Sequence, residues 1–196
     1  DGAFFIGSID ELGIYHEALS DNDVLRHYRY GTAAVRFQVR SGTTRNLQGD
    51  FVGPDGTVGS YYLRAGQTLQ NGENFNQAHP FAQYKAILAS SEDQQGTREL
   101  DSVAIRAAEG IQFDYTSGDF TAGNSAGGSQ ITTEESARAF LGLEKHPTGG
   151  FVSKGTYTGR VLDASAAAGW QGIAWELRSQ EEILSDQRDL TALWHM

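Results

Sequence analysis

The sequence predicts a mainly β protein, an antiparallel β-sandwich or jelly roll with one or two short helices. Glycine is abundant and proline is scarce, with 24 Gly and 3 Pro in 196 residues, which suits many turns and short strands. Apolar and polar residues alternate in "AAVRFQVRSG" at 33–42. Val35, Phe37 and Val39 share one face of the predicted strand, and the arginines lie on the opposite, solvent-exposed face. Turn-forming stretches, such as the Pro-Asp-Gly of 54–56, separate these runs.

The N-terminal segment predicts strands followed by a helix. Apolar residues within 4–15, interrupted by glycines, indicate two short strands. The next stretch, "ALSDNDVLRHYRYG", predicts a helix of about ten residues with Ser20 as its N-cap. Asp23 stands three residues on, where its carboxylate can reach back, and Gly31 suits the position just after the helix.

The rest of the chain reads mainly as strands. They are predicted at 33–42, 61–63, 81–90, 99–107, 155–164, 169–177 and 190–196. Residues 110–131, rich in Gly, Ser and Thr, are interpreted as irregular, with 111–115 as a candidate strand. A capping box of Thr132 and Glu135 predicts a helix over 132–142, and a second such pair predicts one helical turn over 179–186.

Composition and charge restrict the function. The formal net charge of −10 argues against nucleic acid and anionic lipid as partners. The absence of cysteine excludes disulfides, thiolate metal sites and a cysteine nucleophile. No apolar run reaches the length of about 18 residues that a membrane span needs, and no signal peptide is recognisable. Because the chain begins with Asp1 rather than Met, we expect an upstream segment.

No motif predicts catalysis or a cofactor. The five histidines lack metal-ligand spacing, and the sequence has no nucleophile elbow, P-loop or dinucleotide fingerprint. The carboxylates Asp10, Glu11, Asp21 and Asp23 could bind calcium, but capping and solvent exposure explain them better. We therefore expect a protein that is not an enzyme and has no required cofactor.

Two kinds of domain are suggested by resemblance. "FIGSIDELGIYHEALSDNDVLRHYRYG" (5–31) resembles the closing segment of concanavalin A-like, laminin-G-like jelly-roll domains, and "DLTALWHM" (189–196) resembles their first strand. "VRFQVRSG", "FVGPDGT", "FAQYKAILASS" and "LDSVAI" resemble a β-sandwich module of large bacterial surface proteins. The opening strands of that module look like "GTYTGRVLDA" and "GWQGIAW", which here come last.

The resemblance implies a rotated domain order. The implied parts are a closing jelly-roll segment (1–32), a β-sandwich module (33–107), opening sandwich strands (155–188) and a first jelly-roll strand (189–196). Residues 108–154 resemble no known family and are interpreted from composition as an irregular segment with a short helix. Two arrangements stay open. Residues 155–175 can fold back on 34–106 of the same chain, or they can pair with the next copy.

Three functions follow as hypotheses. The preferred one is a non-catalytic structural subunit or repeat of a bacterial cell-surface or extracellular filament, joined to neighbouring copies or adjacent repeats by β-strand complementation. The second is a glycan-binding adhesion module, and the third is an accessory module of a polysaccharide-degrading enzyme. All three place the protein outside the cell or on its surface, without nucleic acid or membrane insertion.

Each hypothesis has candidate residues. The expected interface comprises Tyr157, Val161, Leu162, Ile173, Trp175, Leu190, Leu193 and Trp194. The aromatic candidates for stacking on sugar rings are Tyr61, Tyr62, Trp170 and Trp175. For the two tryptophans a place in the core is the favoured interpretation, because they stand among apolar strand residues.

Overall fold

A computed structural model of the protein describes residues 12–15, 18–108, 110–114, 116–133, 139–164, 169–178 and 190–194. The chain divides into two compact units. The smaller unit combines residues 1–27 with 179–196, and the larger one spans residues 28–178. No helix of the described part is both long and apolar enough to cross a membrane.

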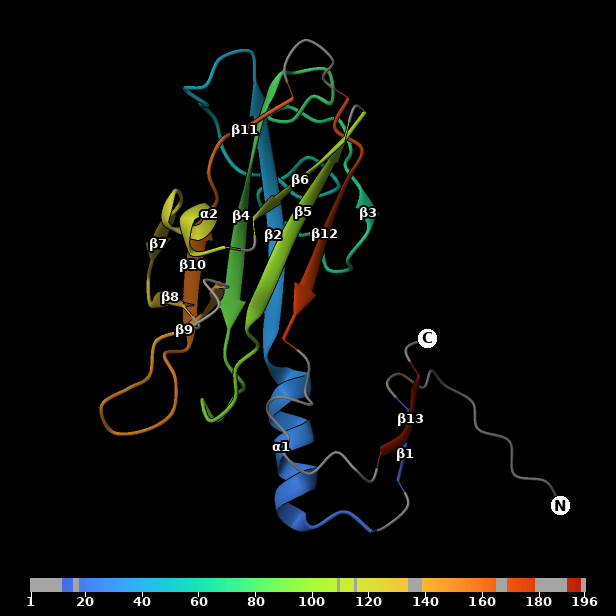
Figure 1. Ribbon diagram of the computed structural model, residues 1–196, viewed down its shortest axis with the longest axis vertical. Coiled ribbons are helices and arrows are strands. Elements are labelled where there is room, and N and C mark those ends of the chain that lie inside the picture. The colour runs from blue at the N-terminus through green and yellow to red at the C-terminus, as the bar shows by residue number, and fades with distance from the viewer. Residues whose placement is uncertain are drawn as a thin grey trace, which may run out of the picture. The chain divides into compact units, whose positions relative to one another are not determined.

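The larger unit is a β-sandwich of two antiparallel sheets, which confirms the predicted fold class (Figure 1). The five-stranded sheet comprises β2 (Ala34–Gly42), β4 (Phe81–Ala89), β10 (Lys154–Thr158), β11 (Leu162–Asp163) and β7 (Asn124–Ala126). The six-stranded sheet comprises β3 (Gln67–Thr68), β12 (Gly172–Leu177), β5 (Leu100–Ala107), β6 (Gly110–Asp114), β9 (Ala139–Leu143) and β8 (Ser129–Thr133).

The alternation in β2 confirms the predicted strand. Val35, Phe37 and Val39 are buried, and β2 pairs with β4 along its whole length. Its other edge is covered, since Phe37 and Val39 form isolated bridges with Tyr62 and Val52. The strand predicted at 61–63 is therefore wrong: only Tyr62 makes a bridge, and its neighbours belong to a loop.

The late strands complete the sheets of their own chain. β10 pairs with β4, with Thr156 opposite Ile87, and β12 pairs with β5, with Ile173 opposite Ile105. Of the two arrangements left open by the sequence, the structure has the one in which residues 155–175 fold back on residues 34–106. The edges of β4 and β5 that the late strands could have left unpaired are therefore paired within one chain.

Segment 108–154 contains more regular structure than the sequence predicts. The helix expected over 132–142 is wrong in its described part, because β8 and β9 pair there from Ser129 to Leu143, and residues 134–138 lie outside the described part. Burial of alternate side chains against the core outweighs the local capping signal. A five-residue helix, α2 (Ser117–Thr121), was missed; Thr116 and Asp119 form its capping box.

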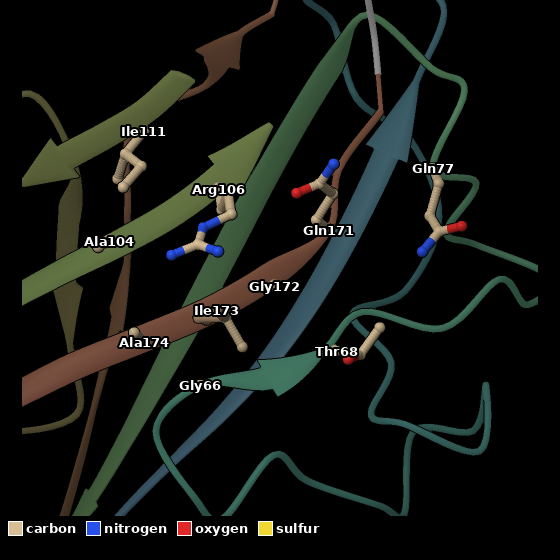
Figure 2. A pocket seen from close by; sticks show the side chains of 10 residues that line it. All are labelled: Gly66, Thr68, Gln77, Ala104, Arg106, Ile111, Gln171, Gly172, Ile173 and Ala174. Carbon is tan, nitrogen blue, oxygen red and sulfur yellow. The ribbon is translucent and has the colours of Figure 1, made fainter. Parts of the chain in front are cut away.

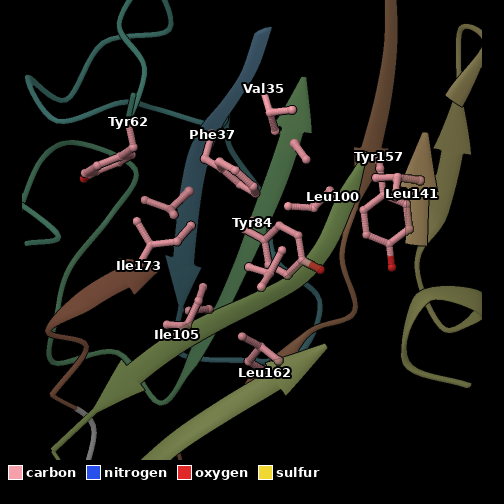
Figure 3. Packing of buried hydrophobic residues seen from close by; sticks show 14 of the residues in the cluster. Val35, Phe37, Tyr62, Tyr84, Leu100, Ile105, Leu141, Tyr157, Leu162 and Ile173 are labelled. Carbon is pink, nitrogen blue, oxygen red and sulfur yellow. The ribbon is translucent and has the colours of Figure 1, made fainter. Parts of the chain in front are cut away.

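Aromatic side chains dominate the core of the larger unit (Figure 3). Phe37, Tyr62, Tyr84 and Tyr157, labelled in Figure 3, are fully buried, and so is Trp170. The ring centroid of Tyr84 lies 6.1 Å from that of Phe37 and 6.1 Å from that of Tyr157. These rings link strands of the five-stranded sheet and pack against Leu100, Ile105 and others from the opposite sheet.

In its described residues, the smaller unit contains one pair of strands. β1 (Leu12–Tyr15) pairs antiparallel with β13 (Leu190–Trp194), so an early and a late segment of the chain meet in one ladder. The register shifts between Ile14 and Tyr15. Predictions for residues 4–11 and 179–186 lie outside the described residues.

Helix α1 (Asp21–Thr32) begins in the smaller unit and ends in the larger one. Its predicted capping box is confirmed, because the Asp23 backbone N–H donates to Ser20 Oγ at 3.2 Å and the Ser20 backbone N–H donates to Asp23 Oδ2 at 3.1 Å. Hydrogen bonds from the Ser20 side chain, then from Arg26, lower the pKa of Asp23 to about 2. The prediction that Gly31 follows the helix is wrong, because Gly31 lies within the last turn of α1.

Candidate functional site

The outer face of the six-stranded sheet carries a depression with a cavity volume of about 400 Å³ (Figure 2). This volume is within the usual range of ligand pockets, about 300–1,000 Å³. We call it the Arg106 pocket. It is lined by Gly66, Thr68, Gln77, Ala104, Arg106, Ile111, Gln171, Gly172, Ile173 and Ala174.

Small residues on the sheet create the depression. Gly172 is opposite both Thr68 and Arg106, and residues directly opposite in antiparallel strands lie on the same face. In the next row of that face, Ala174 is opposite Ala104. Because glycine has no side-chain carbon and alanine has only a methyl group, the floor of the pocket is low between its taller neighbours. The alternate residue Ile173 points to the core and is fully buried.

Trp170 anchors the pocket wall from inside the protein. Its indole N–H donates to the backbone carbonyl oxygen of His79 at 2.8 Å, and its backbone N–H donates to that of Gln77 at 3.2 Å. The Gln77 side-chain amide also donates to the carbonyl oxygen of Leu69 at 2.7 Å. The loop that carries Gln77 is therefore tied to the residue that immediately precedes the pocket residue Gln171.

Two polar groups of the pocket are available to a ligand. Figure 2 shows Arg106 and Gln171 as neighbours over the sheet. Both are exposed, and neither side chain forms a hydrogen bond or ion pair with the residues that the structure describes. A guanidinium offers a planar set of N–H donors and an amide offers both donor and acceptor. The ten lining residues include no carboxylate and no imidazole, so the pocket has groups for recognition rather than for acid–base chemistry.

The predicted aromatic candidates lie outside this pocket. Tyr62 and Trp170 are fully buried, so neither presents a ring to a ligand, as the core interpretation of Trp170 predicts. Trp175 is half-buried and packs on Phe37, with ring centroids 4.4 Å apart. Tyr61 is half-buried beside the five-stranded sheet, where the guanidinium of Arg36 on β2 lies 5.8 Å from its ring centroid.

The predicted interface residues have several different surroundings. Tyr157, Leu162 and Ile173 are buried in the core of their own chain, and burial raises the pKa of the Tyr157 hydroxyl. Val161 is half-buried. Leu190, Leu193 and Trp194 belong to β13, paired with β1, and their side chains lie outside the described part. Tyr157, Leu162 and Ile173 thus pack in the core of their own chain instead of forming a surface for another chain.

A buried polar network crosses between the two sheets. Asp114 on β6 accepts hydrogen bonds from the Tyr84 hydroxyl on β4 at 2.7 Å and from Arg160 Nε at 2.7 Å. Burial raises the pKa of the Asp114 carboxyl, and both hydrogen bonds oppose that rise. Each oxygen of this carboxylate has a partner, so the network stabilises the sandwich rather than offering a free group.

The acidic candidates for calcium are not gathered into a site. Asp23 is held by Ser20 and Arg26, Asp21 is exposed in the first turn of α1, and Asp10 and Glu11 lie outside the described residues. Within the part of the chain that the structure describes, no three His, Asp or Glu side chains are close enough together to hold a metal ion.

Sequence reasoning missed Arg106, Gln77 and Gln171. A signal for the pocket was present in "GIAWEL", where small Gly172 and Ala174 alternate with large Ile173 and Trp175. That pattern indicates a strand whose outward-facing side chains are small. No protein-family model, no curated protein and no solved structure matches this chain.

Proposed function

We propose that the protein is a non-catalytic extracellular module that binds a carboxylated sugar in the Arg106 pocket. The observation that supports this proposal is that the pocket holds a guanidinium and an amide, those of Arg106 and Gln171, above a floor of small residues, and that neither side chain has a partner among the described residues. It corresponds to the second of the hypotheses drawn from the sequence, with a different set of contact residues.

The lining chemistry favours a sugar. Sugars present hydroxyl groups at their edges and C–H groups on their ring faces. Gln171 and Thr68 can exchange hydrogen bonds with hydroxyl groups, and the aliphatic Ile111 offers a surface for C–H groups. Arg106 adds a specific preference, because a guanidinium binds a carboxylate through two parallel hydrogen bonds.

The test uses trigalacturonic acid as the carboxylated probe and maltotriose as the neutral one, with binding measured by isothermal titration calorimetry. We expect the wild-type protein to bind the first more tightly. Arg106→Gln should weaken that binding by about tenfold to a hundredfold, because a charge-assisted hydrogen bond contributes about 1.5–3 kcal/mol. Ala174→Leu should abolish binding, since it fills the floor of the pocket.

Arg64→Gln is the matched control. Arg64 is exposed, lies outside the pocket and is replaced with the same loss of charge, so its variant should bind like the wild type. Unchanged binding in both Arg106→Gln and Ala174→Leu would refute the proposed site. Failure of the wild-type protein to bind either probe would refute a carboxylated sugar of this kind as the ligand.

A second function, strand complementation in a surface filament, is favoured by the smaller unit. Its β1–β13 ladder has two strands, and among the described residues neither outer edge has a partner. An isolated two-stranded sheet is marginally stable at best in water. We therefore propose that strands of a neighbouring copy extend this sheet, which would join copies through backbone hydrogen bonds.

Electron microscopy and intact mass of the protein from its native source test this second function. We expect filaments built of copies, and we expect Ala192→Pro on β13 to abolish them because proline removes a backbone donor and disrupts strand pairing. The sandwich should unfold at its usual temperature in this variant, since position 192 belongs to the other unit. A strictly monomeric native protein would contradict the proposal.

A further inference from the structure

Four cations gather on the outer face of the five-stranded sheet. They are Arg36 and Arg40 on β2, Lys85 on β4 and Lys154 on β10, and we call them the basic face. The inner residues of β2 are buried in the core, so the alternate positions 36 and 40 face outward. On β4 and β10 the register sets the same side: Lys85 lies opposite Gln38 and Thr158.

Aromatic rings hold these cations in place. The Arg40 guanidinium lies 4.4 Å, and the Lys85 ammonium 4.9 Å, from the centroid of the Phe51 ring. The Arg36 guanidinium lies over Tyr61. Cation–π contacts of this kind fix the position of a charge without neutralising it. Arg40 also donates to Gln83 Oε1 at 2.7 Å, which is a neutral acceptor.

Carboxylates offset the positive charge of the basic face only in part, through the effect of Asp50 on Lys85. None of its four cations forms an ion pair with a carboxylate in the described part of the chain. Burial lowers the pKa of Lys85; the nearby Asp50 carboxylate opposes this effect, and the positive charges of Lys154 and Arg40 add to it. Like charges are thus close enough to repel one another, on a chain whose formal net charge is −10.

We propose that the basic face binds an acidic polysaccharide, a polymer whose carboxylate or sulfate groups contact these cations. Arg36 and Lys154 are exposed and Arg40 and Lys85 are half-buried, whereas Gln38 and Ile87 on the same face are buried. The cations are spread over β2, β4 and β10, and this spread suits an extended ligand. Thr156 and Thr158 share the face and add hydroxyl groups for hydrogen bonds.

The net charge of the protein favours this ligand over nucleic acid. Duplex DNA carries one charge per about 1.7 Å of axis, so an acidic protein repels it over its whole length. A polysaccharide with one carboxylate per sugar has a lower charge density and is repelled less, so a local cluster of cations then decides the binding. This site lies on the sheet opposite to the Arg106 pocket and does not depend on it.

Affinity electrophoresis with soluble polymers tests the proposal. The probes are polygalacturonate, dextran sulfate, neutral dextran and duplex DNA at the same salt concentration. We expect retardation by one or both acidic polysaccharides, weakening as salt is raised, and none by dextran. In the double variant Arg36→Gln/Lys154→Gln the dissociation constant should rise about tenfold, because two exposed cations are lost.

The double variant Arg64→Gln/Lys145→Gln removes the same charge from exposed positions outside both the basic face and the Arg106 pocket, and it should bind the polymers like the wild type. An equal loss in both double variants would show a net-charge effect and overturn the proposal. Tighter binding of DNA than of either acidic polysaccharide would assign the face to nucleic acid instead. No retardation of the wild-type protein by either acidic polymer would also overturn it.

Discussion

Replacing Trp170 with alanine is expected to lower the free energy of unfolding of the larger unit by about 3–5 kcal/mol. Trp170 is among the largest fully buried side chains, so alanine would leave a cavity in the core between the sheets. The substitution also removes the indole N–H that donates to the His79 carbonyl oxygen at 2.8 Å. Against a total of about 5–15 kcal/mol for a typical domain, this loss is large.

Urea denaturation followed by circular dichroism measures this effect. Trp170→Phe should lose less than the alanine variant, because it keeps much of the buried ring but not the hydrogen bond. Val58→Ala is the control: Val58 is 58% exposed, so its loss should stay within about 0.5 kcal/mol. An alanine variant at position 170 as stable as the wild type would show that Trp170 does not pack as the structure has it.

Trp170 also shows what the sequence can and cannot predict about the site. Its apolar neighbours indicate a core position, and that interpretation is confirmed. Its hydrogen bonds to the loop of Gln77 and His79 join residues more than 90 positions apart, and no local pattern reports such a contact. The pocket wall therefore could not be predicted, although the small residues of its floor are visible in the sequence.

Some strands could be predicted from local sequence and others could not. β2 and β4 could be predicted because alternation and turn residues are local properties. For the residues of β9 the capping-box spacing of Thr132 and Glu135 wrongly predicts a helix, whereas in the structure they pair with β8, which precedes them in a segment rich in Gly and Ser. Pairing within this segment, rather than local propensity, decides its structure.

The pairing of the late strands was left open by the sequence for a physical reason. A strand with an apolar inner face can complete any sheet that offers the same register, in its own chain or in another. In the structure, Leu162 and Ile173 are buried against their own chain. The same side chains that suggested an interface are thus equally suited to an intramolecular core.

Arg160→Met is the second substitution for which we expect a large effect. It should lower the free energy of unfolding by about 2–3 kcal/mol at pH 7, and we call this loss the deficit. The substitution leaves the buried Asp114 carboxylate with only the Tyr84 hydroxyl as a donor. Two considerations limit the loss. The Arg160 side chain is 34% exposed, so water can replace part of its contribution. Protonating a carboxyl group of ordinary pKa 3.8 at pH 7 costs about 4 kcal/mol, which is the most that the stranded charge can cost.

The pH dependence of the Arg160→Met deficit distinguishes a stranded charge from lost packing. The pKa of Asp114 is already raised by burial, and removing a hydrogen bond that lowers it raises it further. The folded state then holds the proton more tightly than the unfolded state, so the deficit should shrink as pH falls from 7 through the raised pKa towards 3.8. Denaturation of both proteins at pH 7 and pH 5 measures this change.

The double variant Asp114→Asn/Arg160→Met is the control for that charge effect. Asparagine keeps the shape of the side chain at position 114 and cannot ionise, so the change of deficit with pH should disappear. A deficit in Arg160→Met that is the same at both pH values would mean that Arg160 contributes by packing alone. A deficit that shrinks at pH 5 in the single variant and stays constant in the double variant would identify Asp114 as the buried charge that Arg160 stabilises between the two sheets.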